Sequence, residues 1–229
     1  MLKKLQRLLQ SGNTLFYPGC LTKYKATNFQ ENYERILRHL NIDFITIPDF
    51  NCCGSPVLNT GTISNFRKLA RKNLKQFNDY AVNKIITGCP ACYKIFTKDY
   101  AGVLKKDWDI EVEHVSQTIA KLLAENQIQL TKIDKSITYH DPCHLGRHTR
   151  EYQAPRKILK AITDDYREMK LTKEYSMCCG AGGGVSANFP ERASRTATDR
   201  ILQAKETKAD ILVTTCPMCD LQLFHNAAG

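Results

Sequence analysis

The sequence predicts an α/β protein of two duplicated Rossmann-like domains, each a parallel sheet flanked by helices, related by pseudo-two-fold symmetry. Two observations lead to this fold class. Apolar stretches typical of short strands alternate with amphipathic stretches typical of helices. The whole pattern then recurs at an offset of about 125 residues, which indicates an internal duplication. Strands that alternate with helices favour a parallel sheet covered on both faces.

Each half is expected to run strand, helix, strand, helix, strand. The expected elements of the first half are LFYPGC, NFQENYERILRHL, IDFITIP, residues 65–77 and KIITGC. Those of the second half are ITYHDPC, PRKILKAI, YREMKLT, residues 190–204 and DILVTTC. The polar stretch ENQIQLTKIDK separates the halves, so we expect one domain over residues 1–130 and another over 131–229.

Ten cysteines occupy matching places in the two halves. Each half has a single cysteine, a vicinal pair 32 or 35 residues later, and a CxxC motif 36 or 37 residues after the pair. The first set is Cys20, Cys52, Cys53, Cys89 and Cys92. The second set is Cys143, Cys178, Cys179, Cys216 and Cys219. Each CxxC should follow a strand and enter a helix. Crossovers bring the ends of parallel strands to one edge of the sheet, so each set should converge there.

The formal net charge of +10 would suit nucleic acid, an anionic membrane face or an acidic protein. The count treats cysteines as neutral, whereas metal-bound cysteines are thiolates. No basic motif is interleaved with aromatic residues, so we expect no nucleic-acid partner. No stretch approaches the ~20 apolar residues of a membrane span, and a cytoplasmic location is expected. Leu2, Leu5, Leu8 and Leu9 share one helical face beside basic residues, which favours a capping helix; peripheral contact with the inner membrane face is the alternative.

The number of thiols in each set limits the chemistry. A reducing cytoplasm disfavours disulfides, and a bond between adjacent Cys52 and Cys53 would close a strained ring. A structural zinc takes four ligands and would leave one cysteine idle. A thioredoxin-like CxxC would explain neither the vicinal pairs nor the duplication. An iron–sulfur cluster can use all five thiolates, and a cubane that uses four is the alternative.

Residues beside the cysteines suit a bound cluster. Gly54 and Gly180 directly follow the vicinal pairs and allow close approach of the backbone. Pro90 and Pro217, inside the CxxC motifs, can begin helices whose amide ends face negative charge. The run GAGGG at 180–184 follows a cysteine pair and not a clear strand, which argues against a nucleotide-binding loop.

Three histidines flank Cys143 and could supply a ligand, a proton or a hydrogen bond to a ligand. His144 directly follows an expected ligand and is the candidate for proton delivery or cluster tuning. His148 is expected to be exposed, and His140 ends the preceding strand. Asp141 is interpreted as a turn former.

The pattern of one cysteine, a CCG motif and a CxxC motif, present twice, resembles the cysteine-rich CCG-domain family of the heterodisulfide reductase catalytic subunit. Similar pairs occur in iron–sulfur subunits of glycolate oxidase, anaerobic glycerol-3-phosphate dehydrogenase and lactate-utilisation systems. The resemblance spans about Phe16 to Leu223 and includes all ten cysteines. It implies two 4Fe-4S clusters, of the non-cubane type in heterodisulfide reductase, each held by one five-cysteine set; some relatives place zinc at one site. The residues expected in catalysis are Cys20, Cys52, Cys53, Cys143, Cys178 and Cys179, as the resemblance implies, together with His144, which is chosen for its position directly after Cys143.

The resemblance implies an iron–sulfur oxidoreductase subunit that reduces a disulfide with electrons from a partner protein in a hetero-oligomeric complex. One alternative is an electron-transfer subunit of a glycolate, lactate or glycerol-3-phosphate oxidoreductase, which would receive electrons from a flavoprotein subunit and pass them to quinone. The other alternative is a structural module that binds zinc. The two redox functions share the same cluster motifs, so the sequence does not choose between them.

Overall fold

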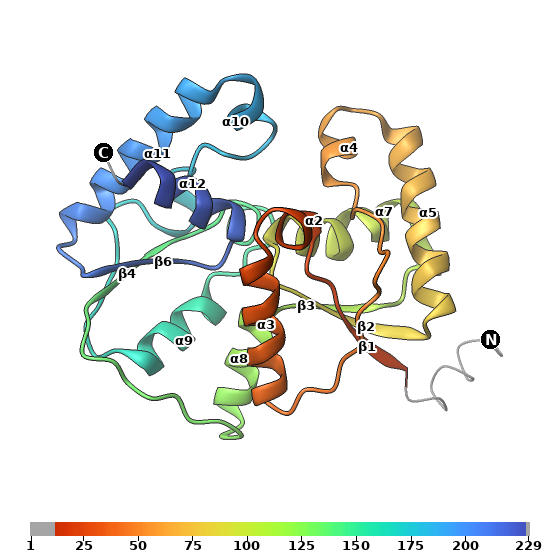
Figure 1. The fold of residues 1–229 in the computed structure, drawn as a ribbon, viewed down its shortest axis with the longest axis horizontal. Coiled ribbons are helices and arrows are strands. Elements are labelled where there is room, and N and C mark those ends of the chain that lie inside the picture. Colours follow the sequence, from red (N-terminus) through yellow and green to blue (C-terminus); the bar gives the residue numbers. More distant parts are fainter. Residues whose placement is uncertain (1–11, 228–229) are drawn as a thin grey trace. The chain divides into compact units, whose positions relative to one another are not determined.

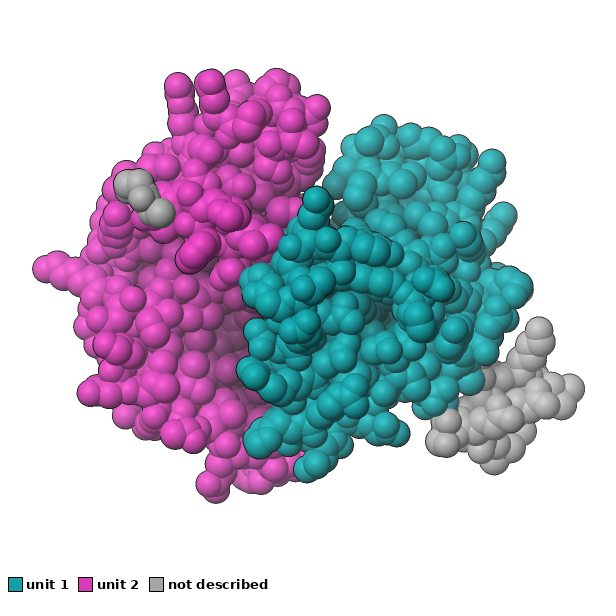
Figure 2. All heavy atoms as spheres, viewed as in Figure 1, with its two compact units in different colours: residues 1–115 teal, residues 116–229 magenta. Residues whose placement is uncertain are grey.

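The computed structural model describes residues 12–227 and divides into two compact units, residues 1–115 and 116–229 (Figures 1 and 2). Each unit contains a three-stranded parallel sheet flanked by helices, which confirms the expected α/β class. The stretch 125–135, expected as a linker, runs as turn and coil after α8 (Val115–Ala124). The assignment of 1–130 and 131–229 as the two domains stays a prediction.

The first unit has the strand order β1-β2-β3, with all neighbours parallel. Its strands are β1 (Asn13–Phe16), β2 (Val82–Thr87) and β3 (Glu111–His114). Its α-helices are α2 (Cys20–Tyr24), α3 (Thr27–His39), α4 (Ser55–Asn59), α5 (Ile63–Asp79), α6 (Pro90–Lys94) and α7 (Tyr100–Leu104). A π-helical turn η1 (Ile95–Asp99) and a 3-10 turn η2 (Lys105–Asp107) flank α7.

The second unit has the strand order β5-β4-β6, again parallel. Its strands are β4 (Ile137–His140), β5 (Tyr166–Arg167) and β6 (Ile211–Thr214). Besides α8, its helical elements are α9 (Gln153–Ile162), η3 (Lys173–Tyr175), α10 (Val185–Asn188), α11 (Pro190–Glu206) and α12 (Pro217–Ala227). As expected, each CxxC follows a strand and enters a helix.

One strand expected in the first unit was wrong, and one strand of that unit was not expected. The stretch IDFITIP is not a strand, because only Ile45 pairs, by a single bridge to Leu15. Pro48 then begins a turn and has no N–H to extend the pairing. The unexpected strand β3 lies at the other edge of the sheet. Its alternating acidic residues hide the apolar pattern, and Lys84 on β2 pairs with Glu113 at 2.8 Å.

The two units fill their cores with side chains of different size. In the first unit, Phe96 lies at the centre of an aromatic cluster with Tyr17, Phe77, Tyr100 and Trp108. In the second unit, the core around the cysteines is built from smaller residues. Its apolar members include Ala181, Ala197, Ile201 and Leu223.

No helix within the described residues is long and apolar enough to cross a bilayer. The face expected at Leu2, Leu5, Leu8 and Leu9 lies outside the described residues, so peripheral membrane contact stays a prediction, as does the cytoplasmic location.

Candidate metal centres

Both CxxC motifs lie at the start of a helix that follows a strand, the central strand β2 in the first unit and the edge strand β6 in the second. In the first unit, β2 ends at Thr87, and the hydroxyl of Thr87 accepts a hydrogen bond of 3.2 Å from the amide of Cys89. Pro90 occupies the first turn of α6, where its missing N–H costs no hydrogen bond. Pro217 begins α12 in the second unit in the same way. The helix N-termini therefore direct their positive ends toward the thiols.

The five thiols of each unit converge. In the first unit, the Sγ atoms of Cys20 and Cys52 lie 3.9 Å apart, and those of Cys53 and Cys92 lie 3.3 Å apart. Contacts between neighbouring thiols link the set in the order Cys20, Cys52, Cys53, Cys92, Cys89. The second unit repeats the order with Cys143, Cys178, Cys179, Cys219, Cys216. All ten cysteines are free thiols.

Each set of thiols has a covered side and an open side. The second cysteine of the vicinal pair and the second cysteine of the CxxC are buried in both units. Those buried residues are Cys53, Cys92, Cys179 and Cys219. The other three cysteines of each set are partly exposed. A group bound by five thiolates would therefore be anchored in the core and reachable from outside.

The first member of each vicinal pair has the most strongly lowered pKa of its set. The pKa of Cys52 is lowered to about 2, chiefly by hydrogen bonds from Cys20 and Cys53, with a further contribution from the amide of Gly54. The pKa of Cys178 is lowered to about 2 by the matching contacts with Cys143 and Cys179 and by the amide of Gly180. Because the thiolate is the form that binds metal, both sites are prepared for a cation.

The glycines after the vicinal pairs aim their amides at these sulfurs. The N–H groups of Gly54 and Gly180 lie 3.5 and 3.3 Å from the Sγ atoms of Cys52 and Cys178. Both glycines have positive φ, 94° and 90°. The backbone therefore needs glycine at these two places to form its sulfur contact.

Replacing Gly180 with alanine is expected to destabilise the second unit by about 1–3 kcal/mol, because alanine strains at positive φ. The new Cβ would also lie 2.5 Å from the carbonyl oxygen of Ala193, which is backbone and cannot rotate away. Gly182→Ala is the matched control, because that position has no atom within 4 Å of an added Cβ. Urea unfolding of both variants checks the prediction; equal losses of stability would contradict it.

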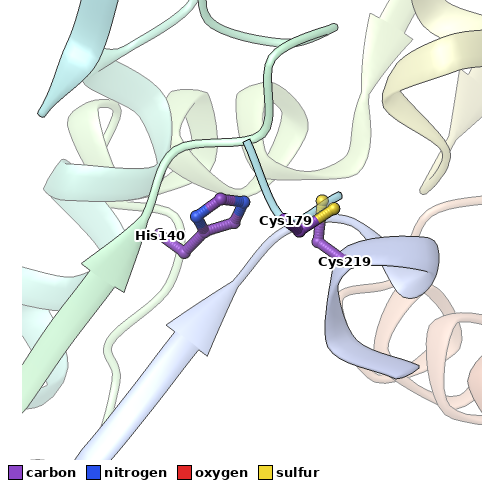
Figure 3. Close-up of side chains that lie close together, drawn as sticks. All are labelled: His140, Cys179 and Cys219. Carbon is purple, nitrogen blue, oxygen red and sulfur yellow. The ribbon is translucent and has the colours of Figure 1, made fainter. Parts of the chain in front are cut away.

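His140 faces the buried thiols of the second unit. Its ring points toward Cys179 and Cys219, and the potential ligand atoms of the three residues lie within 4.8 Å of one another (Figure 3). The Nδ1 atom accepts a hydrogen bond of 3.0 Å from Nε of Arg200. Burial, and then the charge of Arg200, lower the pKa of His140 to about 3, so the ring is neutral.

The other two histidines lie on the open side. The Nδ1 atom of His144 is 3.4 Å from Sγ of Cys143, and the His144 ring stacks on His148 at 4.9 Å between centroids. His148 is exposed, in line with the expectation from sequence. His144 is placed beside an expected ligand, and its role in catalysis stays a prediction.

Asp141 is a buried anchor, so its interpretation as a turn former was incomplete. Its side chain is 3% exposed and accepts two hydrogen bonds from Arg156, at 2.7 and 2.8 Å. The same guanidinium binds Glu168 at 2.6 and 3.0 Å. The network fixes the segment that leads from β4 to Cys143. Sequence reasoning missed Arg156, Glu168 and Arg200.

The donor sets fit an iron–sulfur cluster. Soft thiolates select zinc, Cu(I) or iron–sulfur clusters. A tetrahedral zinc uses four ligands, whereas five thiols converge in each unit. A zinc ion would leave the fifth thiol of each unit without a metal. Because five thiols converge in both units, a polynuclear centre is favoured.

The cysteine-rich domain family known as CCG matches residues 14–97 and again residues 137–224, which confirms the internal duplication. The chain is 33% identical over 224 residues to a subunit of the dihydromethanophenazine:CoB–CoM heterodisulfide reductase of Methanosarcina acetivorans, with 95% of the chain and 55% of that protein covered. It is 33% identical to the EtfAB:quinone oxidoreductase of Syntrophomonas wolfei, with 90% of the chain and 30% of that protein covered. It is 32% identical to a subunit of the fumarate reductase (CoM/CoB) of Methanothermobacter marburgensis, with 91% and 41% covered. The chain thus spans about half or less of the length of these relatives.

Proposed function

Because this chain belongs to the cysteine-rich CCG-domain family, we propose that each unit holds a 4Fe-4S cluster and that the chain is the redox part of a larger oxidoreductase. The observation that carries the proposal is the convergence of five thiols in the same order of contacts in both units. Relatives named as heterodisulfide reductase and quinone oxidoreductase support it.

The activity that we propose is reduction of an organic disulfide with electrons from a partner protein. A bound iron–sulfur cluster supplies one-electron transfer and an iron that can accept a substrate sulfur. The buried cysteines of each set hold the group in the core, and the partly exposed cysteines lie where a substrate can approach. Cleavage of a disulfide to two thiols takes two electrons and two protons. In this proposal His144 holds one of these protons at a ring nitrogen, which the 3.4 Å between its Nδ1 and Sγ of Cys143 supports.

The similarity to EtfAB:quinone oxidoreductase supports a second candidate. In that case the chain would receive electrons from a flavoprotein and pass them toward quinone, without binding a disulfide. Identification of the subunit that co-purifies distinguishes the two: a flavin-containing dehydrogenase favours electron transfer, and a ferredoxin-rich flavin subunit favours disulfide reduction.

We expect anaerobically prepared protein to contain about eight irons and about eight acid-labile sulfides per chain, four of each per site. With a low-potential electron donor it should reduce an organic disulfide. Protein stripped of iron and sulfide is the control and should be inactive. Zinc without sulfide at both sites would contradict the proposal, whereas zinc at one site would leave one cluster. Activity that survives loss of both clusters would exclude cluster-based disulfide reduction.

A further inference from the structure

Arg200, on α11, is a buried arginine without a carboxylate partner in the described part of the chain. It is 0% exposed, and each of its hydrogen bonds goes to a neutral acceptor. The acceptors are His140 Nδ1 at 3.0 Å, Leu171 O at 2.9 Å, Gln203 Oε1 at 2.7 Å and Ser176 Oγ at 3.1 Å. A buried charge without a countercharge is costly. The negative charges that act on Arg200 are those of Asp141, which is already paired with Arg156, and of Cys219 in the second set of thiols, so an anionic group bound at that set would complete its compensation.

The hydrogen bond from Arg200 fixes the tautomer of His140. Because Nδ1 accepts a hydrogen from the guanidinium, its lone pair is used, and the proton of the neutral ring lies on Nε2. That atom is buried and has no hydrogen-bond partner among the described residues. A buried N–H normally finds an acceptor. The ring faces Cys179 and Cys219, whose sulfurs accept hydrogen bonds when they are thiolates bound to metal (Figure 3).

The first unit has neutral groups at the matching places, and both donate hydrogen bonds to backbone carbonyls. Asn73 is the eleventh residue of the 17-residue helix α5, as Arg200 is of the 17-residue α11, and both are fully buried. The amide of Asn73 donates to the carbonyl of Cys52 at 2.9 Å. Tyr17, which precedes Cys20 as His140 precedes Cys143, donates its hydroxyl to the carbonyl of Asn51 at 2.8 Å.

We propose that His140 donates a hydrogen bond through Nε2 to the iron–sulfur cluster of the second unit. In this proposal Arg200 is the positioning residue, and its buried positive charge compensates the anionic cluster. The inference rests on the proposed iron–sulfur cofactor. Reduction adds negative charge to a cluster, and hydrogen bonds to its sulfurs raise its reduction potential. The two units hold the same set of thiols but differ in the polar groups that tune them.

The test is an EPR-monitored redox titration of the full chain, loaded anaerobically, as wild type and as His140→Phe and Arg200→Gln. Signals lost in Cys179→Ser identify the second cluster. Each variant should keep its iron. The equilibrium constant for reduction of the second cluster should fall about tenfold, which lowers its reduction potential by about 59 mV for one electron. Tyr17→Phe removes the matching hydroxyl of the first unit and should leave the reduction potential of the second cluster unchanged. An unchanged potential in both variants would overturn the proposal.

A second measurement does not depend on how well the variants fold. Pulsed EPR of wild-type protein labelled with ¹⁵N-histidine should show a weak nitrogen coupling to the reduced second cluster, retained in Arg200→Lys. The coupling should disappear if His140→Gln, which keeps an N–H donor, replaces the histidine. No coupling in the wild type would overturn the proposal, and a strong coupling of a directly bound nitrogen would also overturn it, because His140 would be a ligand. Wild-type protein without iron and sulfide would refute the proposed cofactor instead, so the two failures are distinguishable.

Discussion

Replacing Cys179 with serine is expected to remove about half of the iron and leave the first site loaded. Cys179 lies in the middle of its set, between the thiols of Cys178 and Cys219, and is 3% exposed. A serine hydroxyl in this place is a poor ligand for iron and cannot turn toward water. The first unit has five thiols of its own, so its site should still assemble. Iron and acid-labile sulfide per chain give the measurement, and circular dichroism should show that most secondary structure is kept.

Cys53→Ser is the reciprocal control. Cys53 is the buried member of the first vicinal pair, and its Sγ lies 3.3 Å from that of Cys92. Its replacement should therefore remove the iron of the first site and leave the second site loaded. The two substitutions together should remove both halves. Loss of all iron from either single variant would contradict independent sites and would mean that the units share one metal centre. Full retention of iron would show that the vicinal cysteine is not a ligand.

Replacing Arg156 with methionine is expected to lower the free energy of unfolding of the second unit by about 3–5 kcal/mol. Arg156 is 6% exposed and is held between Asp141 and Glu168. Methionine would occupy similar volume but would leave the carboxylate of Asp141 buried without its charged partner. Urea unfolding gives the measurement, and the second unit should unfold before the first.

The exposed pair of Lys132 and Asp164 provides the control for Arg156. Its side chains are 57% and 81% exposed, so Lys132→Met should change stability by less than ~1 kcal/mol. Adding Asp141→Asn to Arg156→Met should recover part of the loss, because the stranded charge is removed. If Arg156→Met cost no more than Lys132→Met, the buried network would not stabilise the unit.

The parallel α/β architecture could be predicted because its signals are local. Apolar strands, amphipathic helices and the repeated cysteines are each visible within short windows, and the topology then places the strand ends at one edge. The strand expected at residues 42–48 failed because a single paired residue, Ile45, does not extend into a ladder. The strand β3 was missed because its acidic residues are stabilised by Lys84, which is distant in the sequence.

The buried charges near the second site were not predicted, because charged residues are usually exposed and their partners here come from separate segments. Arg200 did leave a signal. It falls on the face of α11 that carries Ala193, Ala197 and Ala204, all buried. An arginine on an otherwise small and apolar helix face indicates a buried charge. Arg156, by contrast, lies in a stretch with other basic residues, and nothing in the sequence distinguishes it from an exposed one.

The open side of each cysteine set also determines its sensitivity to air. An edge that admits an organic sulfur admits dioxygen, which is smaller. The cysteines on that edge include Cys52 and Cys178, the two whose thiolates are most favoured, and thiolates oxidise more readily than thiols. The buried cysteines are shielded by the core. Exposure to oxygen should therefore damage each site from its accessible edge inward, with the buried cysteines the last to be oxidised.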